Sequence, residues 1–250
     1  MPTLAEAEAL THAAAAAGVP AQVGLVLRTS PVFVALREVV SSGRLGRPMA
    51  VSFRDDQFFP IQGHYNSTWR KDVAIAGSGA LLEHSIHDLD ILRFCLGEVR
   101  EVWARTANHA GHEGIEDVAV VTLSFVSGAT ASLVSVWHEV LTRPSGRRVE
   151  VFFERGLAWF DDDYRGPLHL ETSAGTEIRS CEAPSWVGEL RLPDDPVMNT
   201  VRQYAEANLG FLEAVASGRP PSPGPGEALA AHRLAAAAYQ SAATGRPVHC

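Results

Sequence analysis

Two strand-like runs meet at a Ser-Gly turn in residues 116–138, EDVAVVTLSFVSGATASLVSVWH. They cover residues 116–126 and 129–138, and Ser127-Gly128 joins them as a β-hairpin. Further turns are predicted at Arg155-Gly156 and Ala174-Gly175. The other strand-like segments lie at residues 98–107, 147–154, 157–161 and 167–172. Strands joined by short turns predict a large, mostly antiparallel sheet with one solvated or docked face.

Helical segments and one further strand flank the predicted sheet in the sequence. The run MAVSFRDDQF, residues 49–58, alternates like a half-buried strand, and a polar, aromatic-rich loop follows it. A helix is predicted from about residue 79 to residue 96. Two helices are predicted near the C-terminus, at about 197–217 and 226–243, with the breaker-rich loop GRPPSPGPGE between them.

The first 45 residues have a different pattern. Thr3 and Glu6 form a capping box for a helix that ends at Gly18. The apolar run AQVGLVL, residues 21–27, predicts a strand buried on both faces, and a helix follows over about 31–42. One strand between two helices cannot form a stable layer, so its neighbours come from elsewhere or the chain lacks its beginning.

Composition excludes several classes of protein. The chain has 250 residues, of which 46% are hydrophobic, and this content excludes intrinsic disorder. A formal net charge of −8 argues against nucleic-acid binding. Three distant cysteines without a C-x-x-C pair argue against a disulfide framework and against a thiolate zinc site. With no signal peptide and no apolar run of membrane-spanning length, a cytoplasmic protein without a membrane segment is expected.

The segment most informative about chemistry is GSGALLEHSIHDLD, residues 77–90. In an α-helix Glu83 and His87 share one face, and Asp90 lies close to that line. A carboxylate beside an imidazole holds the ring's tautomer and raises its pKa, which suits a proton donor or acceptor. An incidental Glu–His pair on a surface helix explains the same spacing.

Three alternative interpretations apply to this region. Gly77 and Gly79 after the run VAIA resemble the start of a dinucleotide fingerprint, but Leu82 stands where a third small residue is needed. His84 and His87, with Asp88 and Asp90, have some of the spacing of metal ligands. The loop GHYNSTWR, residues 63–70, mixes groups that suit a polyhydroxylated ligand, although it also fits an ordinary polar connection.

In several sequence blocks the chain resembles the Gfo/Idh/MocA family of NAD(P)-dependent oxidoreductases. Residues 77–97 match the family pattern G-G-G-x-L-x-D-x-G-x-H-x-x-D, followed by an apolar helix and L-G. The block SSGRLGRP matches its helix-to-strand connection, and the runs QVGLVLRTSP, TWRKD and ATGRPV follow in the family's order. The resemblance covers almost the whole chain.

The resemblance implies an α/β (α+β) protein with two parts. Residues 1–45 would be the C-terminal remnant of a Rossmann dinucleotide-binding domain. Residues 46–250 would form the α/β substrate domain, whose open sheet often mediates oligomers in the family, so a homo-oligomer is expected. NAD or NADP would be the cofactor, and a sugar, polyol or similar hydroxylated molecule would be the substrate.

The resemblance also assigns roles to individual residues. His87 matches the family's catalytic histidine, and Glu83 matches the aspartate one turn earlier. Arg28 matches an arginine near the cofactor. The positions that would line the substrate cleft are His64, Trp69, Arg70 and Asp90. No metal ligand is assigned.

The chain departs from the family at its start. Met1-Pro2-Thr3-Leu4 stands directly after the place of the family's E-K-P motif, so the phosphate-binding loop, the ribose-binding acid and the E-K-P lysine are expected to be missing. The main hypothesis is an N-terminally truncated oxidoreductase that binds dinucleotides weakly or not at all. A non-catalytic sugar-binding or oligomerisation domain is the alternative, and a metal-dependent lyase or hydrolase using His84 and His87 is a third.

Overall fold

The computed structural model describes residues 1–164, 166–181 and 196–250. In this part of the chain the strands form one nine-stranded sheet, in the order β8-β7-β6-β5-β1-β4-β3-β2-β9. The bounds in chain order are β1 Pro48–Phe58, β2 Val99–Ala107, β3 Val118–Phe125, β4 Thr130–His138, β5 Gly146–Phe153, β6 Gly156–Phe160, β7 Leu168–Thr172, β8 Gly175–Arg179 and β9 Val248–His249. Strands β1 and β4 are parallel, and every other neighbouring pair is antiparallel. The predicted mostly antiparallel sheet is confirmed.

The predicted strands and turns agree closely with the observed ones. Each predicted segment between residues 98 and 172 overlaps one strand, and the turn at Ala174-Gly175 leads into the additional strand β8. At the Ser127-Gly128 turn Gly128 has φ +93°, a conformation that L side chains rarely adopt. Local turn chemistry therefore predicted the hairpins correctly.

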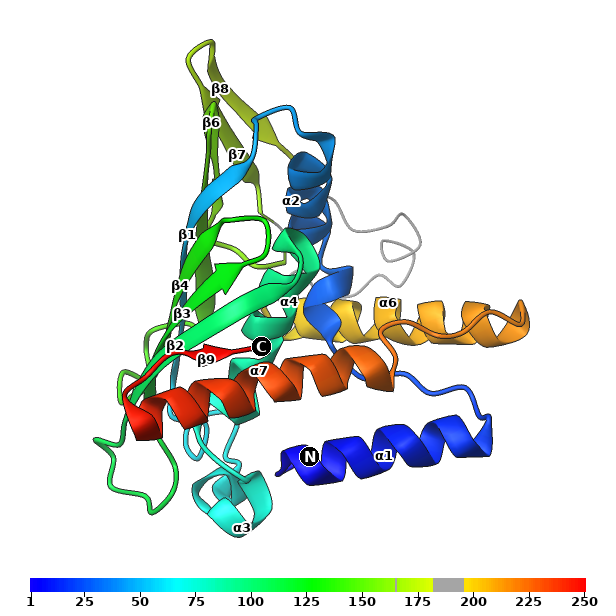
Figure 1. Ribbon diagram of the computed structural model, residues 1–250, viewed down its shortest axis with the longest axis vertical. Coiled ribbons are helices and arrows are strands. Elements are labelled where there is room, and N and C mark those ends of the chain that lie inside the picture. Colours follow the sequence, from blue (N-terminus) through cyan, green and yellow to red (C-terminus); the bar gives the residue numbers. More distant parts are fainter. Residues whose placement is uncertain (165, 182–195) are drawn as a thin grey trace.

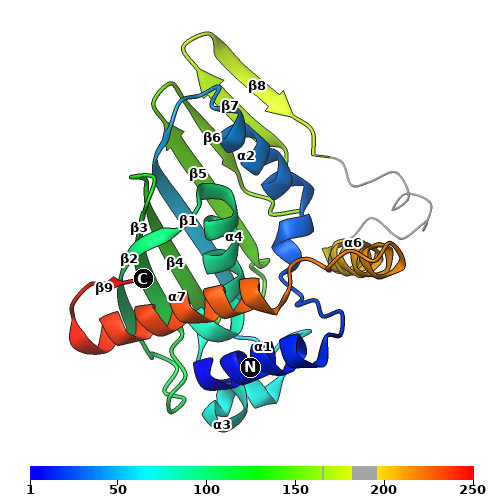
Figure 2. The same cartoon turned by 45° about the vertical axis from the view of Figure 1, so that its right-hand side comes forward.

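Helices cover one face of the sheet (Figures 1 and 2). Helix α7 packs against β2, α4 packs against α7 and α2, and α1 lies against α7. The bounds are α1 Leu4–Ala17, α2 Pro31–Ser42, α3 Val73–Ala76, α4 Ile86–Leu96, α6 Pro196–Ala216 and α7 Pro225–Thr244, with short 3₁₀ segments η1 Val26–Thr29 and η2 Thr68–Lys71 and the π-helical η3 Ala80–His84.

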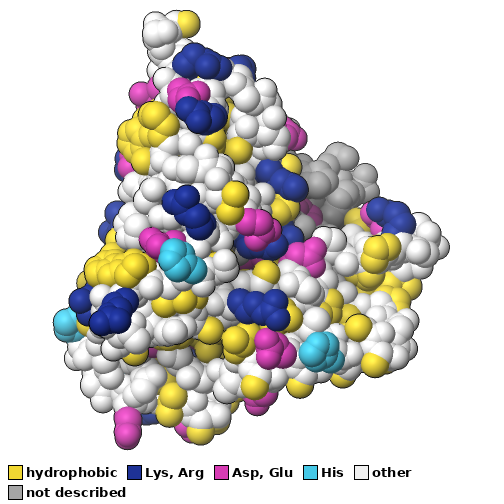
Figure 3. All heavy atoms as spheres, viewed as in Figure 1, with side chains coloured by type: hydrophobic (Ala, Val, Ile, Leu, Met, Phe, Trp, Pro, Cys, Tyr) yellow, Lys and Arg dark blue, Asp and Glu magenta, His cyan; other side chains and the backbone are white. Residues whose placement is uncertain are grey.

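The space-filling view shows cationic and acidic side chains interspersed over the face that it presents (Figure 3). No helix in the described ranges has the length and apolarity needed to cross a membrane.

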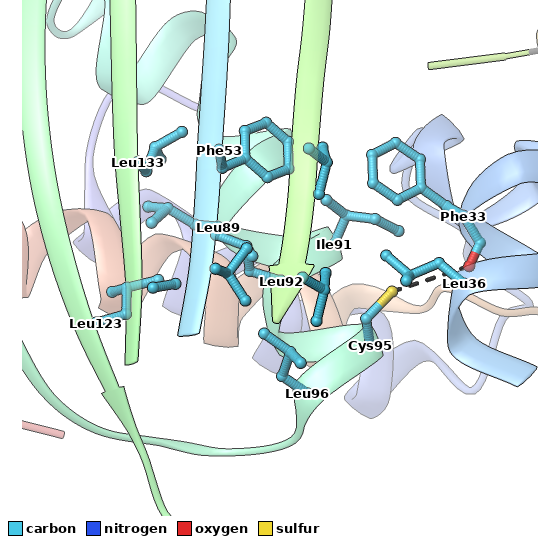
Figure 4. Close-up of a cluster of buried hydrophobic side chains, with 14 of the residues drawn as sticks. Phe33, Leu36, Phe53, Leu89, Ile91, Leu92, Cys95, Leu96, Leu123 and Leu133 are labelled. Carbon is cyan, nitrogen blue, oxygen red and sulfur yellow. Dashed lines mark hydrogen bonds between the residues drawn. The ribbon is translucent and has the colours of Figure 1, made fainter. Parts of the chain in front are cut away.

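The core lies between the sheet and helices α2 and α4 (Figure 4). Phe33 of α2 meets Phe160 of β6 edge to face, with the ring centroids 5.0 Å apart, and stacks on Phe53 of β1. Ile91 and Leu92 of α4 fill the same cluster. Burial of each such side chain contributes about 1.5–3 kcal/mol. This core fixes the axis of α4, and with it the residues at the start of that helix.

The N-terminal helix has the predicted caps. The Glu6 N–H donates to Thr3 Oγ1 at 3.2 Å, and the Thr3 N–H donates to Glu6 Oε2 at 3.0 Å. Gly18 ends the helix with φ +61°. The capping box is therefore confirmed.

The predicted strand at residues 21–27 is wrong. The Val23 N–H donates to the Pro223 carbonyl oxygen at 2.8 Å, and residues Val26–Thr29 turn into η1. A strand needs a neighbouring strand to satisfy its backbone groups, and the run is instead placed by Pro223 and by packing of η1 against α6. Its apolar side chains Leu25 and Leu27 are nevertheless buried.

Candidate active site

The segment that leads into α4 is wound as a π-helix. In η3 the Ser85 N–H donates to the Ala80 carbonyl oxygen, five residues back, at 2.8 Å. Ser85 then separates η3 from α4. The sequence predicted one continuous helix, in which Glu83 and His87 share a face. The wider π turn breaks that spacing, and such turns occur frequently at functional sites.

A buried carboxylate holds the start of η3. Glu116 accepts hydrogen bonds from Ser78 Oγ at 2.8 Å and from the N–H groups of Gly79 at 2.8 Å and Leu81 at 2.9 Å. The Tyr239 hydroxyl donates to it at 2.7 Å. Sequence reasoning missed this residue. Four donors on one carboxylate fix the orientation of η3, and a negative charge is favourable at the N-terminal end of a helical segment.

The two glycines of this segment allow close backbone contacts within the chain. A Cβ on Gly79 would lie 1.9 Å from the Glu116 carbonyl oxygen, and one on Gly77 would lie 2.3 Å from that of Pro2. The preceding Val73–Ala76 is the helix α3 and not a strand. The interpretation of these residues as a dinucleotide fingerprint is therefore wrong, because the cradle is filled by this chain's own backbone.

His87 lies in the first turn of α4, and its ring is neutral. Burial lowers the pKa of His87 to about 4, and the charges of Arg147 and His84 act in the same direction. Its Nδ1 atom is buried and has no hydrogen-bond partner among the described residues. The expectation that Glu83 raises this pKa is wrong, because burial determines it. A neutral imidazole is the form that accepts a proton.

Glu83 pairs with Arg70. Arg70 Nε donates to Glu83 Oε1 at 2.7 Å, and the two side chains are 22% and 12% exposed. The guanidinium carbon also lies 4.8 Å from the centre of the exposed Trp69 ring. Glu83 Oε2 is buried without a partner in the described part of the chain. Three predicted site residues thus form one group, called here the Glu83 group: a carboxylate, a cation and an aromatic plane.

His64 lies beside this group. Its ring contacts Phe58, with centroids 5.2 Å apart, and Tyr65, with centroids 4.2 Å apart. The Tyr65 ring centre is in turn 6.0 Å from the Arg70 guanidinium carbon. His64 is therefore placed near Arg70 through Tyr65.

Asp90 and Arg28 bind each other. Arg28 Nε and Nη2 donate to the two carboxylate oxygens of Asp90 at 2.8 and 2.6 Å. The Asp90 side chain is 1% exposed, and burial raises its pKa. The prediction that Asp90 faces the substrate is wrong for this structure, since its oxygens are taken up by a pair that joins η1 to α4. Arg28, predicted near the cofactor, is held by the same pair.

A second set of charged residues lies under the start of α4. The sequence did not predict that these residues come together. Arg147 of β5 stands directly opposite Asp55 of β1 in the sheet register. Its guanidinium donates to Asp88 at 2.6 Å, to Asp163 at 2.6 Å and to Asp55 at 3.2 Å. His84 Nε2 lies 2.9 Å from Asp55 Oδ2. These five residues are called the Arg147 cluster.

The Arg147 cluster contains three carboxylates and one guanidinium. Burial raises the pKa of Asp88 to about 6 and also raises that of Asp55. Burial lowers the pKa of His84 to about 4, and the charge of Arg147 acts in the same direction. Near neutral pH the histidine is therefore neutral, and burial makes both Asp55 and Asp88 easier to protonate than an exposed aspartate.

The alternation of inward and outward residues along β1 and β5 could have indicated this cluster. Asp55 follows the inward residues Val51 and Phe53 of β1, and Arg147 precedes the inward residue Val149 of β5. A charge at an inward position needs a partner of opposite charge. Only the pairing of β1 with β5 shows that these two residues are partners.

The metal interpretation gains no geometric support. The described residues contain no group of three or more His, Cys, Asp or Glu side chains arranged to hold a metal ion. Nε2 of His84 faces Asp55 and Arg147.

A family model places this fold and site in a known group. The model described as the GFO/IDH/MocA C-terminal domain matches residues 33–158, about half of the chain. The chain belongs to the GFO/IDH/MocA family. The matched range includes β1, η3 and α4, so it contains Glu83, His87 and most of the Arg147 cluster. The resemblance predicted from residues 77–97 is confirmed.

Individual relatives agree with this membership. The sequence is 31% identical over 238 residues to the uncharacterized oxidoreductase YrbE of Bacillus subtilis (strain 168), across 92% of this chain and 63% of that protein. It is 28% identical over 248 residues to 1,5-anhydro-D-fructose reductase of Ensifer adhaerens, across 98% of this chain and 68% of that protein. The chain thus spans less than two-thirds of the length of the first of these relatives.

A solved structure shows the same arrangement. An oxidoreductase from Agrobacterium radiobacter, in complex with NAD+, L-tartaric acid and magnesium, superposes with a TM-score of 0.81 and 25% identity, over 99% of this chain and 70% of that chain. The predicted mixed α/β fold with an open sheet is therefore shared with this solved oxidoreductase.

Proposed function

We propose that this chain carries the proton-transfer and substrate-binding site of an NAD(P)-dependent oxidoreductase that acts on a hydroxyl-bearing carbon of a sugar, polyol or similar small molecule. Family membership supports the reaction class, and the names of the relatives support the substrate class. The observation that carries the proposal is His87: a neutral imidazole at the start of α4, with a buried and unpartnered Nδ1.

Each residue of the site has a defined part in this proposal. His87 accepts the proton of the substrate hydroxyl during oxidation and returns it during reduction. The unpartnered Glu83 oxygen accepts a hydrogen bond from another substrate hydroxyl, and the exposed Trp69 ring stacks on the C–H surface of the substrate. Arg70 holds the Glu83 carboxylate in place. The hydride of this reaction class would be supplied or taken by a bound nicotinamide.

The residues nominated for the cofactor do not fit it. Arg28 is held by Asp90, and the Gly77 and Gly79 positions are filled by backbone of this chain. A dinucleotide pyrophosphate needs free backbone N–H groups at a helix N-terminus. We therefore expect the 250-residue chain by itself to bind NADH or NADPH weakly or not at all. A micromolar affinity would refute this expectation.

The test compares two forms of the protein. The 250-residue chain, and a form extended upstream wherever its source reading frame continues, are titrated with NADH and NADPH by fluorescence. Any form that binds is assayed with a panel of sugars and polyols, together with His87→Gln and the exposed control His249→Gln. Turnover that disappears in His87→Gln and persists in His249→Gln supports the proposal. Equal turnover in both variants would rule out His87 as the acid/base residue.

We also propose that the face of the sheet opposite the helices pairs with a second copy of the chain, as part of the enzyme or as a non-catalytic assembly. Large apolar side chains project from it: Phe152 is 42% exposed and Ile178 is 64% exposed. Trp159 stacks on His169 on the same face, with centroids 3.9 Å apart. The test is light scattering of the wild type and of Phe152→Glu; a monomeric wild type would contradict the pairing.

A cytoplasmic location is proposed on a separate ground. The three cysteines, Cys95, Cys181 and Cys250, are free, and the first two are buried. Free thiols suit a reducing compartment. Fractionation of the source cells tests this location, and recovery from an oxidising compartment would contradict it.

A further inference from the structure

We propose that His84 and Asp55 form a second proton-transfer couple in this site, in which the imidazole passes a proton from the His87 side to the buried carboxylate. The inference rests on the proposed role of His87 as the residue that exchanges a proton with the substrate. The family pattern quoted above specifies no residue at position 84, and Asp55 lies outside that pattern. The couple is thus a feature of this chain's own residues.

The first support is the geometry of the pair. His84 Nε2 and Asp55 Oδ2 are 2.9 Å apart, and their side chains are 23% and 1% exposed. The imidazole therefore reaches from the partly open site to a carboxylate that is closed to solvent. With the proton on Nε2, the opposite nitrogen Nδ1 has a lone pair free to accept another.

The second support is the structure that holds Asp55 in place. Arg147 Nη2 donates to Asp55 Oδ2 at 3.2 Å, and the same nitrogen lies 3.3 Å from His84 Nε2. Ser85 Oγ donates to Ser135 Oγ at 2.6 Å and lies 3.4 Å from Asp55 Oδ2. Arg147 of β5 and Ser85 at the N-terminal end of α4 thus converge on one carboxylate oxygen, and Ser135 of β4 holds Ser85 in place.

The third support is the charge balance of the Arg147 cluster. Asp55, Asp88 and Asp163 surround a single guanidinium, so one carboxylate can take up a proton without leaving Arg147 unpaired. The charges of Asp88, Glu83 and Asp163 favour a proton on His84 and that of Arg147 opposes it, while the charge of His84 lowers the pKa of His87.

The step balances in protons and electrons. An N–H bond of His87, which is protonated after taking the substrate hydroxyl proton, breaks as the proton passes to His84, and His87 becomes neutral again. An N–H bond forms at His84 Nδ1, the Nε2–H bond breaks, and an O–H bond forms at Asp55 Oδ2. The His84 imidazole is neutral before and after but changes from the Nε2–H to the Nδ1–H tautomer, Asp55 loses its negative charge as His87 loses its positive one, and no electron is transferred. Reduction of the substrate runs the same steps in reverse.

The test has one readout that does not depend on turnover. Imidazole ¹⁵N NMR of the intact chain, with His84→Gln used to assign the signals, reports the tautomer of His84. We expect the Nε2–H tautomer at pH 7, with no imidazolium, and loss of its hydrogen-bonded proton signal in Asp55→Ala. An Nδ1–H tautomer or an imidazolium at pH 7 would overturn the couple, whether or not the protein turns over.

Activity supplies the second readout. In a form that turns over, His84→Gln is expected to lower kcat about 100-fold with KM unchanged. Asp55→Asn keeps a hydrogen-bond acceptor for His84 but cannot take up the proton, so a similar loss of kcat is expected while the tautomer is retained. His249→Gln, on an 80% exposed side chain, is the control. Wild-type kcat in Asp55→Asn with the tautomer retained would overturn the relay. Failure of the proposed function is distinguishable, since His87→Gln would then leave turnover unchanged.

Discussion

Replacement of Arg147 by methionine tests whether a single cation holds the three buried carboxylates together. Methionine keeps an unbranched apolar stem of similar reach and removes the contacts to Asp88 at 2.6 Å, Asp163 at 2.6 Å and Asp55 at 3.2 Å. Removal of one partner from a buried ion pair costs about 3–5 kcal/mol, because the remaining charge is left uncompensated. We expect a loss of that size in the free energy of unfolding at pH 7.

The pH dependence of this loss separates charge from packing. The folded pKa of Asp88, about 6, lies above its ordinary value of 3.8, so the folded state binds more protons than the unfolded state between these values. Stability contributed by this group therefore falls as the pH rises from about 4 to 6. Without Arg147 the folded pKa rises further, and each unit is worth about 1.4 kcal/mol. The loss in Arg147→Met should thus be smaller at pH 5 than at pH 7 by roughly that amount or more.

Urea denaturation at the two pH values measures both quantities. Arg148→Met is the matched control, because this neighbouring side chain is 45% exposed and its contacts, to Glu150 at 3.1 Å and to the Trp159 ring centre at 5.6 Å, lie outside the Arg147 cluster. Surface substitutions of this kind usually change stability by less than about 0.5 kcal/mol. An Arg147→Met loss that equals that of the control, or one that is the same at pH 5 and pH 7, would refute the electrostatic reasoning.

Three further predictions follow from the site. Between pH 4 and 6.5 only the unfolded state takes up a proton at His87, because the folded pKa is about 4, so the wild type gains about 3 kcal/mol of stability as the pH rises through this range. His87→Gln should remove this gain, and urea denaturation across the same range measures it. Glu83→Gln should raise the KM for the hydroxylated substrate about tenfold by weakening the pair with Arg70, and steady-state kinetics would show it. Glu116→Gln should lower stability by about 1–3 kcal/mol, because its amide would face N–H donors, and an unchanged denaturation midpoint would argue against this.

The strands could be predicted from the sequence because their determinants are local. Turn residues at Ser127-Gly128 and Arg155-Gly156 marked the hairpins, and the structure places β3–β4 and β5–β6 there. The failure at residues 21–27 has the opposite cause. An apolar run shows that a segment is buried, but a strand also requires a neighbour, and Val23 bonds to Pro223 instead.

The site was only partly predictable for a related reason. Glu83 and His87 were found through their spacing, yet their relative placement depends on the π turn of η3. That turn is held by Glu116, which lies more than thirty residues away in the sequence. No local pattern at residues 77–90 contains this information.

The Arg147 cluster connects the sheet to the chemistry proposed for α4. Asp55 and Arg147 lie on β1 and β5, whose positions are fixed by the sheet, while Asp88 belongs to the helix that carries His87. A buried ion pair adds little stability compared with apolar packing, so stability alone does not explain three carboxylates around one guanidinium. The raised pKa of Asp88, about 6, places a titrating carboxyl group on the helix that carries His87. If His84 and Asp55 pass protons as proposed, Arg147→Met should alter the pH profile of kcat as well as stability, whereas a purely structural cluster would alter stability alone.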